Sequence, residues 1–174
     1  MTLISRALMG AICACFVATM TVIVAANEDP KWPFILNIAP SQNAIQPGIP
    51  TWKTGAPVFV ILTMKNESEH VLHFNLTNPA FNYRTTVIDS QGRPVPETEN
   101  LRKMKENLKD ISRNNFVTLK PHETCQDTIE ISYFFDLSKP GEYAVQVERD
   151  LPPELGKGIV KSNIIKISMV YVVE

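Results

Sequence analysis

The residues that could do covalent chemistry are few, and their spacing favours a structural role. A cysteine beside a histidine can act as an activated thiolate, and His122 and Cys125 lie near one predicted turn. That spacing does not fix which way each side chain points, and no Asn or Asp that would orient the histidine is identifiable. We therefore interpret Cys125 as a small buried apolar residue, with a reactive thiolate as the alternative.

The remaining candidate metal ligands are also poorly placed. His70 and His73 are three residues apart on a predicted strand, so their side chains point to opposite faces, where we expect both to be solvated. Three methionines fall on predicted apolar faces, where filling the core is favoured over binding copper: Met64, Met104 and Met169. We predict no metal and no cofactor.

Sequence motifs of the common catalytic classes are absent. The sequence has no GxSxG, HExxH or CxxC, no glycine-rich phosphate loop and no calcium-binding EF-hand pattern. We therefore predict that the protein is not an enzyme. An enzyme whose site is invisible in the sequence remains the least favoured alternative.

The first 26 residues have the pattern of a secretory signal peptide. Arg6 is followed by an apolar run from Ala7 to Val24 and by small residues, so we expect cleavage after Ala26. The prediction is a secreted or periplasmic protein that has no membrane segment after cleavage. A retained membrane anchor is the alternative, because the run approaches the length that spans a bilayer.

Charge and cysteine content restrict the partners and the means of stabilisation. Loss of Arg6 with the signal peptide reduces the 17 Lys and Arg residues by one, which leaves two fewer than the 18 carboxylates. This small negative net charge gives no reason to expect a nucleic acid as the partner. Cys125 is the only cysteine after the cleavage site, so no intramolecular disulfide can form. We expect a flexible lead-in over 27–33 and one domain over 34–174, stabilised by packing.

Alternating apolar and polar residues predict most of the strands. Thirteen prolines against seven glycines, spread along the chain, mark strand ends and edges. The predicted strands are Phe34–Ala39, Val58–Met64, Val71–Leu76, Tyr83–Asp89, Phe116–Leu119, Asp127–Phe135, Tyr143–Val147 and Ser162–Glu174. Pro40–Pro57 is predicted to be a loop with at most a short edge pairing.

One segment has a helical pattern. Four apolar residues recur at helical spacing over Glu97–Arg113 and form one stripe, with mostly basic residues on the other faces: Leu101, Met104, Leu108 and Ile111. We predict a helical insertion over about 98–112 that covers an open sheet edge. A partner-binding helix is the alternative.

The segment Tyr133–Arg149 contains a corner between two strands. Pro140 and Gly141 interrupt the alternation, and Tyr143 opens the second strand. This arrangement is similar to the tyrosine corner of immunoglobulin-like sandwiches, in which the tyrosine hydroxyl bonds to upstream backbone. Asp136, Gly141 and Tyr143 are the predicted structural corner.

Together these patterns predict an all-β fold. We expect an immunoglobulin-like Greek-key sandwich of about seven to nine antiparallel strands, with the terminal strand, the longest, beside the Tyr143 strand. Four turns should gather at one end: Asn66–Glu69, Ser90–Arg93, Lys120–Thr124 and Asp150–Gly158.

The longest of these turns is the candidate partner-binding loop. Leu151 and Leu155 are apolar residues in a loop, held between a stiff proline pair and two glycines. The candidate binding residues are Leu151, Pro152, Pro153, Glu154, Leu155 and Lys157. The alternative is that both leucines fold back as a lid on the core.

Three motifs near the C-terminus resemble those of small exported bacterial immunoglobulin-like sandwich proteins of unassigned activity. They are the turn Leu119–Glu123, the corner Asp136–Tyr143 and the closing strand Ser162–Ile167. A fainter resemblance over Val58–Val95 is to the intracellular-proteinase-inhibitor-like sandwich, through Asn66–Ser68 and Asp89–Gly92.

The predicted function is a non-catalytic extracytoplasmic binding or assembly module whose partner is another protein. The alternative is a proteinase inhibitor that presents a rigid loop. Two glycosylation sequons, at Asn66 and Asn75, would matter only if a eukaryote secretes the chain.

Overall fold

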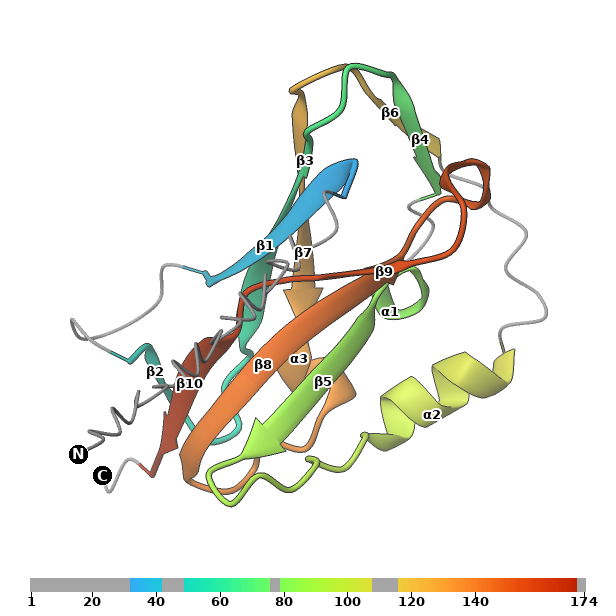
Figure 1. Cartoon of the computed structure of the whole chain (residues 1–174). Helices are drawn as coiled ribbons and strands as arrows, with labels where there is room; N and C mark the ends of the chain where they lie inside the picture. The colour runs from blue at the N-terminus through green and yellow to red at the C-terminus, as the bar shows by residue number, and fades with distance from the viewer. Residues whose placement is uncertain (1–31, 42–48, 76–78, 108–115, 172–174) are drawn as a thin grey trace, which may run out of the picture. The chain divides into compact units, whose positions relative to one another are not determined.

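Ten β-strands make up most of the computed structural model, which describes residues 32–41, 49–75, 79–107 and 116–171 (Figure 1). The strands are β1 (Phe34–Pro40), β2 (Thr51–Lys53), β3 (Phe59–Asn66), β4 (Leu72–Asn75), β5 (Arg84–Asp89), β6 (Phe116–Leu119), β7 (Thr124–Glu130), β8 (Gly141–Asp150), β9 (Ile159–Lys161) and β10 (Ile165–Val170). The helical elements are α1 (Pro79–Asn82), α2 (Glu99–Glu106), α3 (Ile131–Phe134) and the 3₁₀ turn η2 (Pro153–Leu155).

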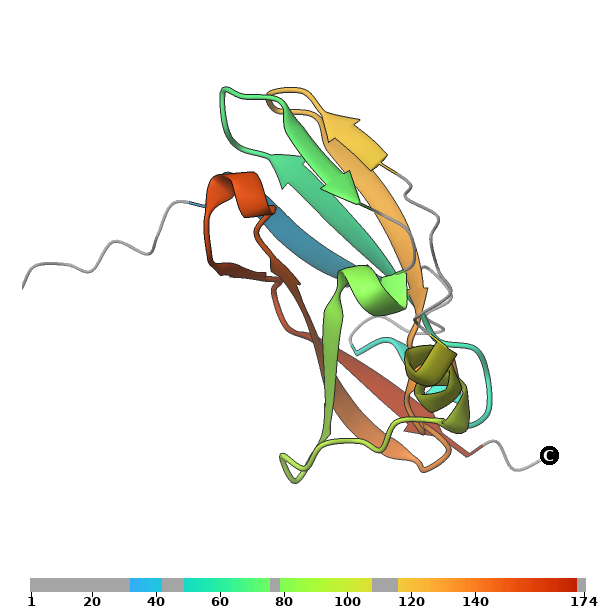
Figure 2. The same ribbon diagram turned by 90° about the vertical axis from the view of Figure 1, so that its right-hand side faces the viewer.

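The strands form two layers, which Figure 2 shows from the side. One sheet has the order β1-β3-β7, and the other has the order β2-β10-β8-β5 with β9 also paired to β8. A third pair, β4-β6, continues from β3 and β7. Every pairing is antiparallel except that of β2 with β10. The predicted all-β sandwich is confirmed, with more strands than the seven to nine expected.

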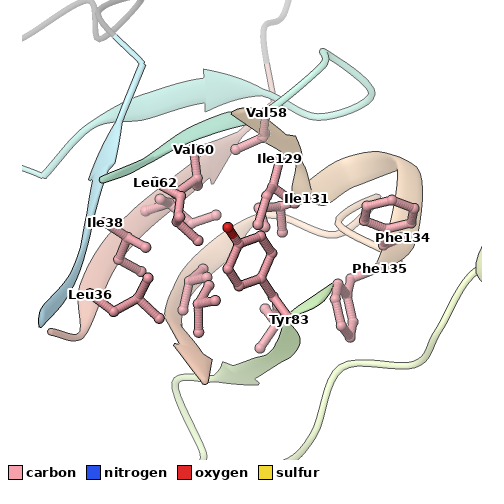
Figure 3. Close-up of a cluster of buried hydrophobic side chains, with 14 of the residues drawn as sticks. Leu36, Ile38, Val58, Val60, Leu62, Tyr83, Ile129, Ile131, Phe134 and Phe135 are labelled. Atoms are coloured by element: carbon pink, nitrogen blue, oxygen red, sulfur yellow. The ribbon is translucent and has the colours of Figure 1, made fainter. Parts of the chain in front are cut away.

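Strand β3 shows how the alternating sequence becomes a core. Val60, Leu62 and Met64 are fully buried, whereas the residues between them on the other face are only half-buried. Successive side chains of a strand point to opposite faces, so every second residue of β3 faces the core and the residues between them form the other, half-buried face. Figure 3 shows Val60 and Leu62 packed with side chains from the other elements, among them Tyr83, Ile129 and Phe135.

The predicted strand Asp127–Phe135 is wrong in its second half. Strand β7 ends at Glu130, and the helical turn α3 follows, closed by a 2.8 Å hydrogen bond from the Phe135 N–H to the Ile131 carbonyl. The turn buries Ile131 and Phe134, three residues apart, which strand alternation could not do. The chain then crosses from β7, which pairs with β3, to β8 in the other sheet, so Pro140-Gly141 does not join two paired strands.

Helix α2 begins as predicted. The Thr98 hydroxyl accepts a 3.3 Å hydrogen bond from the Leu101 N–H, which is the usual cap at a helix start. Leu101 is buried and Met104 packs against the core. The helix ends at Glu106, and the remainder of the predicted segment, from 108 to 112, lies outside the described residues.

The last strand lies inside its sheet, as predicted, because β10 pairs with both β8 and β2. It is not the longest strand: β10 has 6 residues within the described part of the chain and β8 has 10. The segment Ser162–Ile164 separates β9 from β10, and both of these strands pair with β8.

The prediction that four turns gather at one end is wrong for Ser90–Arg93. Asp89 pairs with Tyr143 at the start of β8, whereas Asp150 stands at the other end of the same strand. The Ser90–Arg93 turn therefore lies at the corner end of the sandwich, away from the Asp150–Gly158 loop.

Asn66 joins two of the other turns. Its side-chain amide donates to the carbonyls of His70, Leu119 and Lys120 at 2.7–3.0 Å, and its own N–H donates to the Glu123 carbonyl at 3.0 Å. Asn66 is fully buried. In the folded protein its amide nitrogen is thus engaged and inaccessible, so a glycan attached to this nitrogen would not fit the fold.

Two residues of the predicted lead-in, Trp32 and Pro33, contact the sandwich. Trp32 packs against the core, and the Pro33 carbonyl accepts a 2.9 Å hydrogen bond from the Glu67 N–H. The last two residues of the predicted lead-in are thus part of the domain, whereas residues 27–31 lie outside the described residues, as does the predicted signal peptide. No helix in the described part of the chain is long and apolar enough to cross a membrane.

Candidate partner-binding cleft

A cavity of about 350 Å³ lies where the Asp150–Gly158 loop approaches β4, β6 and α1. We call it the loop cleft. Its walls include the predicted loop residues Leu151, Pro152 and Glu154. The other lining residues include His73, Phe81, Asn82 and Phe116, from distant parts of the sequence, and Arg149, which directly precedes the loop. The fold therefore adds a second wall to the loop that the sequence singles out.

The loop itself does not project its leucines into solvent. Leu151 and Leu155 are half-buried and pack against the core, and Pro152 is buried. Glu154 and Lys157 are exposed, and Pro153 begins the turn η2. This is the arrangement of the alternative in which the leucines cover the end of the core, and binding of a partner by these residues stays a prediction.

Trp32 and Gly158 hold the base of the loop. A Cβ on Gly158 would come within 2.7 Å of the Trp32 ring and within 2.9 Å of a Leu151 methyl group. The Leu151 N–H donates a 3.0 Å hydrogen bond to the Gly158 carbonyl. The loop is therefore closed at its neck, which fixes the position of Leu151 at the cleft.

Arg149 is the residue that sequence reasoning missed. It is only 8% exposed, and its guanidinium carbon lies 5.1 Å from the centre of the Phe74 ring and 5.0 Å from that of Tyr83. Its Nη2 donates a 2.9 Å hydrogen bond to the Asn75 carbonyl. The alternation of β8, with Tyr143, Val145 and Val147 buried, already places Arg149 on the inner face, and that signal would have found it.

The polar groups around Arg149 are incompletely paired. Within the described residues, its Nη1 and the side-chain nitrogen of Asn82 are buried without a well-aligned hydrogen-bond partner, and so is the Tyr83 hydroxyl, which lies close enough to the Arg149 guanidinium for a weak interaction only. Burial raises the pKa of Tyr83 to about 12, although the charge of Arg149 opposes this shift. Burial also lowers the pKa of Arg149. The inner wall of the cleft thus holds a desolvated cation.

The acidic groups at the cleft differ in their engagement. Both carboxylate oxygens of Asp150 accept hydrogen bonds from Arg84, at 2.9 and 3.0 Å. Glu154 is exposed at the rim. Asp150 is therefore held by a cation outside the cleft, while Arg149 has no ion pair with a carboxylate in the described part of the chain.

The corner at the other end of β8 has the geometry of a tyrosine corner. The Tyr143 hydroxyl donates a 2.8 Å hydrogen bond to the Lys139 carbonyl. Asp136 accepts a 3.1 Å hydrogen bond from the Ser138 N–H, and bonding to Ser138 holds the pKa of the Asp136 carboxyl below its usual range. Gly141, with φ +148°, has a conformation that L side chains rarely adopt. These contacts fix the crossing between the sheets.

The residues with potential for covalent or metal chemistry are not brought together. His122 is exposed, with its Nε2 3.4 Å from a Glu69 carboxylate oxygen, whereas Cys125 is half-buried on β7. Burial raises the pKa of the Cys125 thiol, the opposite of what a nucleophile needs. His70 and His73 are exposed, and the described residues contain no group of three or more potential metal ligands.

Comparison with solved structures finds distant similarities. A β-glucosidase from Listeria innocua is 16% identical with a TM-score of 0.41, and the match covers 80% of this chain and 16% of that one. The CARDB domain of PF1109 from Pyrococcus furiosus is 12% identical with a TM-score of 0.40, covering 80% and 96%. The ASH or PapD-like domain of human CEP192 is 14% identical with a TM-score of 0.37, covering 90% and 99%. The chain thus spans only 16% of the glucosidase, and likenesses at these scores carry no argument about function.

Comparison by sequence gives two results. No curated protein matches the chain. The sequence model of the family described as flagellar collar protein C, N-terminal domain, matches residues 50–170, from the start of β2 to the end of β10. That match covers most of the chain, which belongs to the family of flagellar collar protein C N-terminal domains.

Proposed function

We propose that this chain is a non-catalytic assembly module that works outside the cytoplasm and binds another protein of a flagellar collar through the loop cleft. The observation that carries the proposal is the family match, which extends over nearly the whole described sandwich. The predicted signal peptide supports an extracytoplasmic location.

The surface of the cleft supports its choice as the contact site. Phe116, which is 64% exposed, and the half-buried Phe81 both line the cleft. An exposed aromatic side chain beside a concave surface is the usual anchor of a protein interface, because its burial in the complex removes a large apolar area from water.

The test replaces Phe116 with serine in the organism that makes the protein. Tyr171 provides a matched control, because it is an aromatic residue that is 66% exposed and is not among the residues lining the cleft. We expect Phe116→Ser to prevent incorporation of the protein into the collar, measured by cross-linking in cells and by electron cryo-tomography of the flagellar base. Tyr171→Ser should leave incorporation unchanged. Equal incorporation of both variants would contradict a role for the cleft.

Export is tested separately by cell fractionation. We expect the native protein to lack residues 1–26 and to be found outside the cytoplasm, and an intact N-terminus in the cytoplasmic fraction would contradict this. Inhibition of a proteinase is supported less well, because an inhibitory loop has to offer accessible side chains. The two leucines of this loop pack against the core instead.

A further inference from the structure

The wall of the loop cleft contains two buried donors that have no well-aligned acceptor among the described residues, although the Tyr83 hydroxyl lies close enough to the Arg149 guanidinium to interact with it. They are Nη1 of Arg149 and the side-chain nitrogen of Asn82, and both residues line the same cavity. A buried donor without an acceptor costs free energy, and a charged donor costs more than a neutral one. The chemical group that would complete both is an oxygen acceptor, and beside a guanidinium the strongest one is a carboxylate.

The rest of the cavity is suited to an apolar side chain. Phe81, Phe116, Leu151 and Pro152 contribute to its walls, and its volume of about 350 Å³ is at the lower end of the range for ligand pockets. A ligand that combines a carboxylate with a neighbouring apolar group would therefore use both the donors and the walls.

We propose that the loop cleft binds the C-terminal carboxylate of a partner polypeptide together with the apolar side chain of its last residue, and that Arg149 and Asn82 are the donors to that carboxylate. This inference rests on the proposed function and specifies the chemistry of the partner at that site. Arg149 stays in place without the partner because Phe74 and Tyr83 stack on its guanidinium.

Two features of the cleft set conditions on binding. Both donor atoms are shielded from solvent, so a ligand reaches them only after a side-chain rotation at the wall. Glu154 repels an approaching carboxylate, whereas Asp150 is held by Arg84. Removal of the Glu154 charge should therefore strengthen binding of the carboxylate. Glu154 is exposed, so its replacement should leave the core unchanged.

The probes are N-acetyl-phenylalaninate and N-acetyl-phenylalanine amide, which share one apolar group and differ in the carboxylate. Binding to the full domain is followed by NMR, through the side-chain signals of Arg149 and Asn82, at constant ionic strength. We expect a saturable shift with the acid and at least about tenfold weaker binding of the amide, as loss of a charge-assisted hydrogen bond requires. Equal affinities for the acid and the amide would overturn the proposal. So would the absence of a shift in either signal up to about 20 mM acid, because a dissociation constant above that concentration means negligible binding.

Variants assign the binding to this cleft. Glu154→Gln should tighten binding of the acid about twofold to fivefold, the scale of an interaction with an exposed charge. Phe116→Ser should weaken binding of the acid and the amide alike, and Tyr171→Ser should change neither. Arg149→Met should abolish the preference for the acid, and the Glu154 and Phe116 variants decide the question if that protein does not fold. Weaker binding of the acid to Glu154→Gln would refute the assigned geometry.

The outcomes separate this proposal from the assembly function. Loss of collar incorporation in Phe116→Ser, with no preference for the acid, would retain the function and refute the carboxylate chemistry. A preference for the acid, with normal incorporation of Phe116→Ser, would establish the ligand chemistry and show that the collar contact lies elsewhere.

Discussion

The side chain of Asn163 bonds to both backbone polar groups of Ile38. Its oxygen accepts a 2.8 Å hydrogen bond from the Ile38 N–H, and its nitrogen donates to the Ile38 carbonyl at 3.0 Å. Ile38 lies on β1, at the edge opposite β3, and Asn163 lies in the break between β9 and β10. The Asn163 side chain thus takes the hydrogen bonds that a further strand beside β1 would make. This protects the β1 edge from pairing with another chain.

Replacement of Asn163 with alanine should destabilise the domain by about 1–3 kcal/mol, because two backbone groups of a partly buried strand lose their partners. Urea denaturation measures the loss. Asn100→Ala is the control, since Asn100 is exposed on α2 and should change stability by less than about 0.5 kcal/mol. Equal effects of the two substitutions would show that the Asn163 contacts contribute nothing net.

Two buried tyrosines should respond in opposite directions to loss of their hydroxyl groups. Tyr143→Phe removes the hydrogen bond to Lys139 and should cost about 1 kcal/mol. Tyr83→Phe removes a buried hydroxyl that has no well-aligned hydrogen-bond partner among the described residues and interacts only weakly with Arg149, so stability should stay the same or rise by up to about 1 kcal/mol. Both are measured by urea denaturation. A larger loss for Tyr83→Phe than for Tyr143→Phe would contradict the hydrogen-bond assignments.

The raised pKa of Tyr83 predicts a loss of stability at alkaline pH. The unfolded chain releases the Tyr83 proton near its ordinary pKa of about 10, whereas the folded protein retains it to about 12. The contribution of this pKa difference to the free energy of unfolding is therefore complete below about pH 10. It is lost as the pH rises to 12, by about 1.4 kcal/mol for each pH unit. The measurement is the difference in unfolding free energy between the wild type and Tyr83→Phe at each pH. A difference that does not vary between pH 9 and pH 11 (about one unit either side of the ordinary pKa) would contradict it.

The contact between Gly158 and Trp32 predicts that even a methyl group is too large at position 158. Gly158→Ala should cost about 1–3 kcal/mol, because the new Cβ would be closer to the ring than van der Waals contact allows. Gly92→Ala tests the effect of alanine at a glycine with open space, although its φ of +78° adds strain of its own. Combining Gly158→Ala with Trp32→Ala should recover part of the loss attributed to the clash. Independent, additive effects would refute that attribution.

Alternation in the sequence was sufficient to locate most strands and the buried face of each. Val60, Leu62 and Met64 illustrate this, because a strand has a fixed period of two and burial follows from it directly. The pattern failed at Ile131–Phe134, where alternating residues form a helical turn. There the Ile131 N–H bonds to the Val58 carbonyl and the Ser132 hydroxyl accepts from the Val58 N–H, contacts made across 73 and 74 residues of sequence.

The candidate site was only half predictable for a similar reason. The loop residues Leu151, Pro152 and Glu154 are marked by local composition. Phe116 joins them only through the pairing of β4 with β6, whereas Arg149 is next to the loop in sequence and falls on the inner face of β8 by alternation. Residue type alone suggests that an arginine is exposed. The two aromatic rings that stabilise Arg149 in the interior, Phe74 and Tyr83, are remote in sequence and give no local signal.

The position of β10 between β2 and β8 has a consequence for the order of folding. The pairing of Thr51 with Ser168 joins residues 117 apart in sequence, so the five-stranded sheet has a high contact order and cannot close until the C-terminal strand is available. A chain passed through an export channel from its N-terminus would therefore stay open until release is nearly complete, with the β8 edge exposed in the meantime. We expect a chain that ends at Asn163 to be degraded rapidly by protease while the intact chain resists. Equal resistance of the two would show that the sheet forms without its last strand.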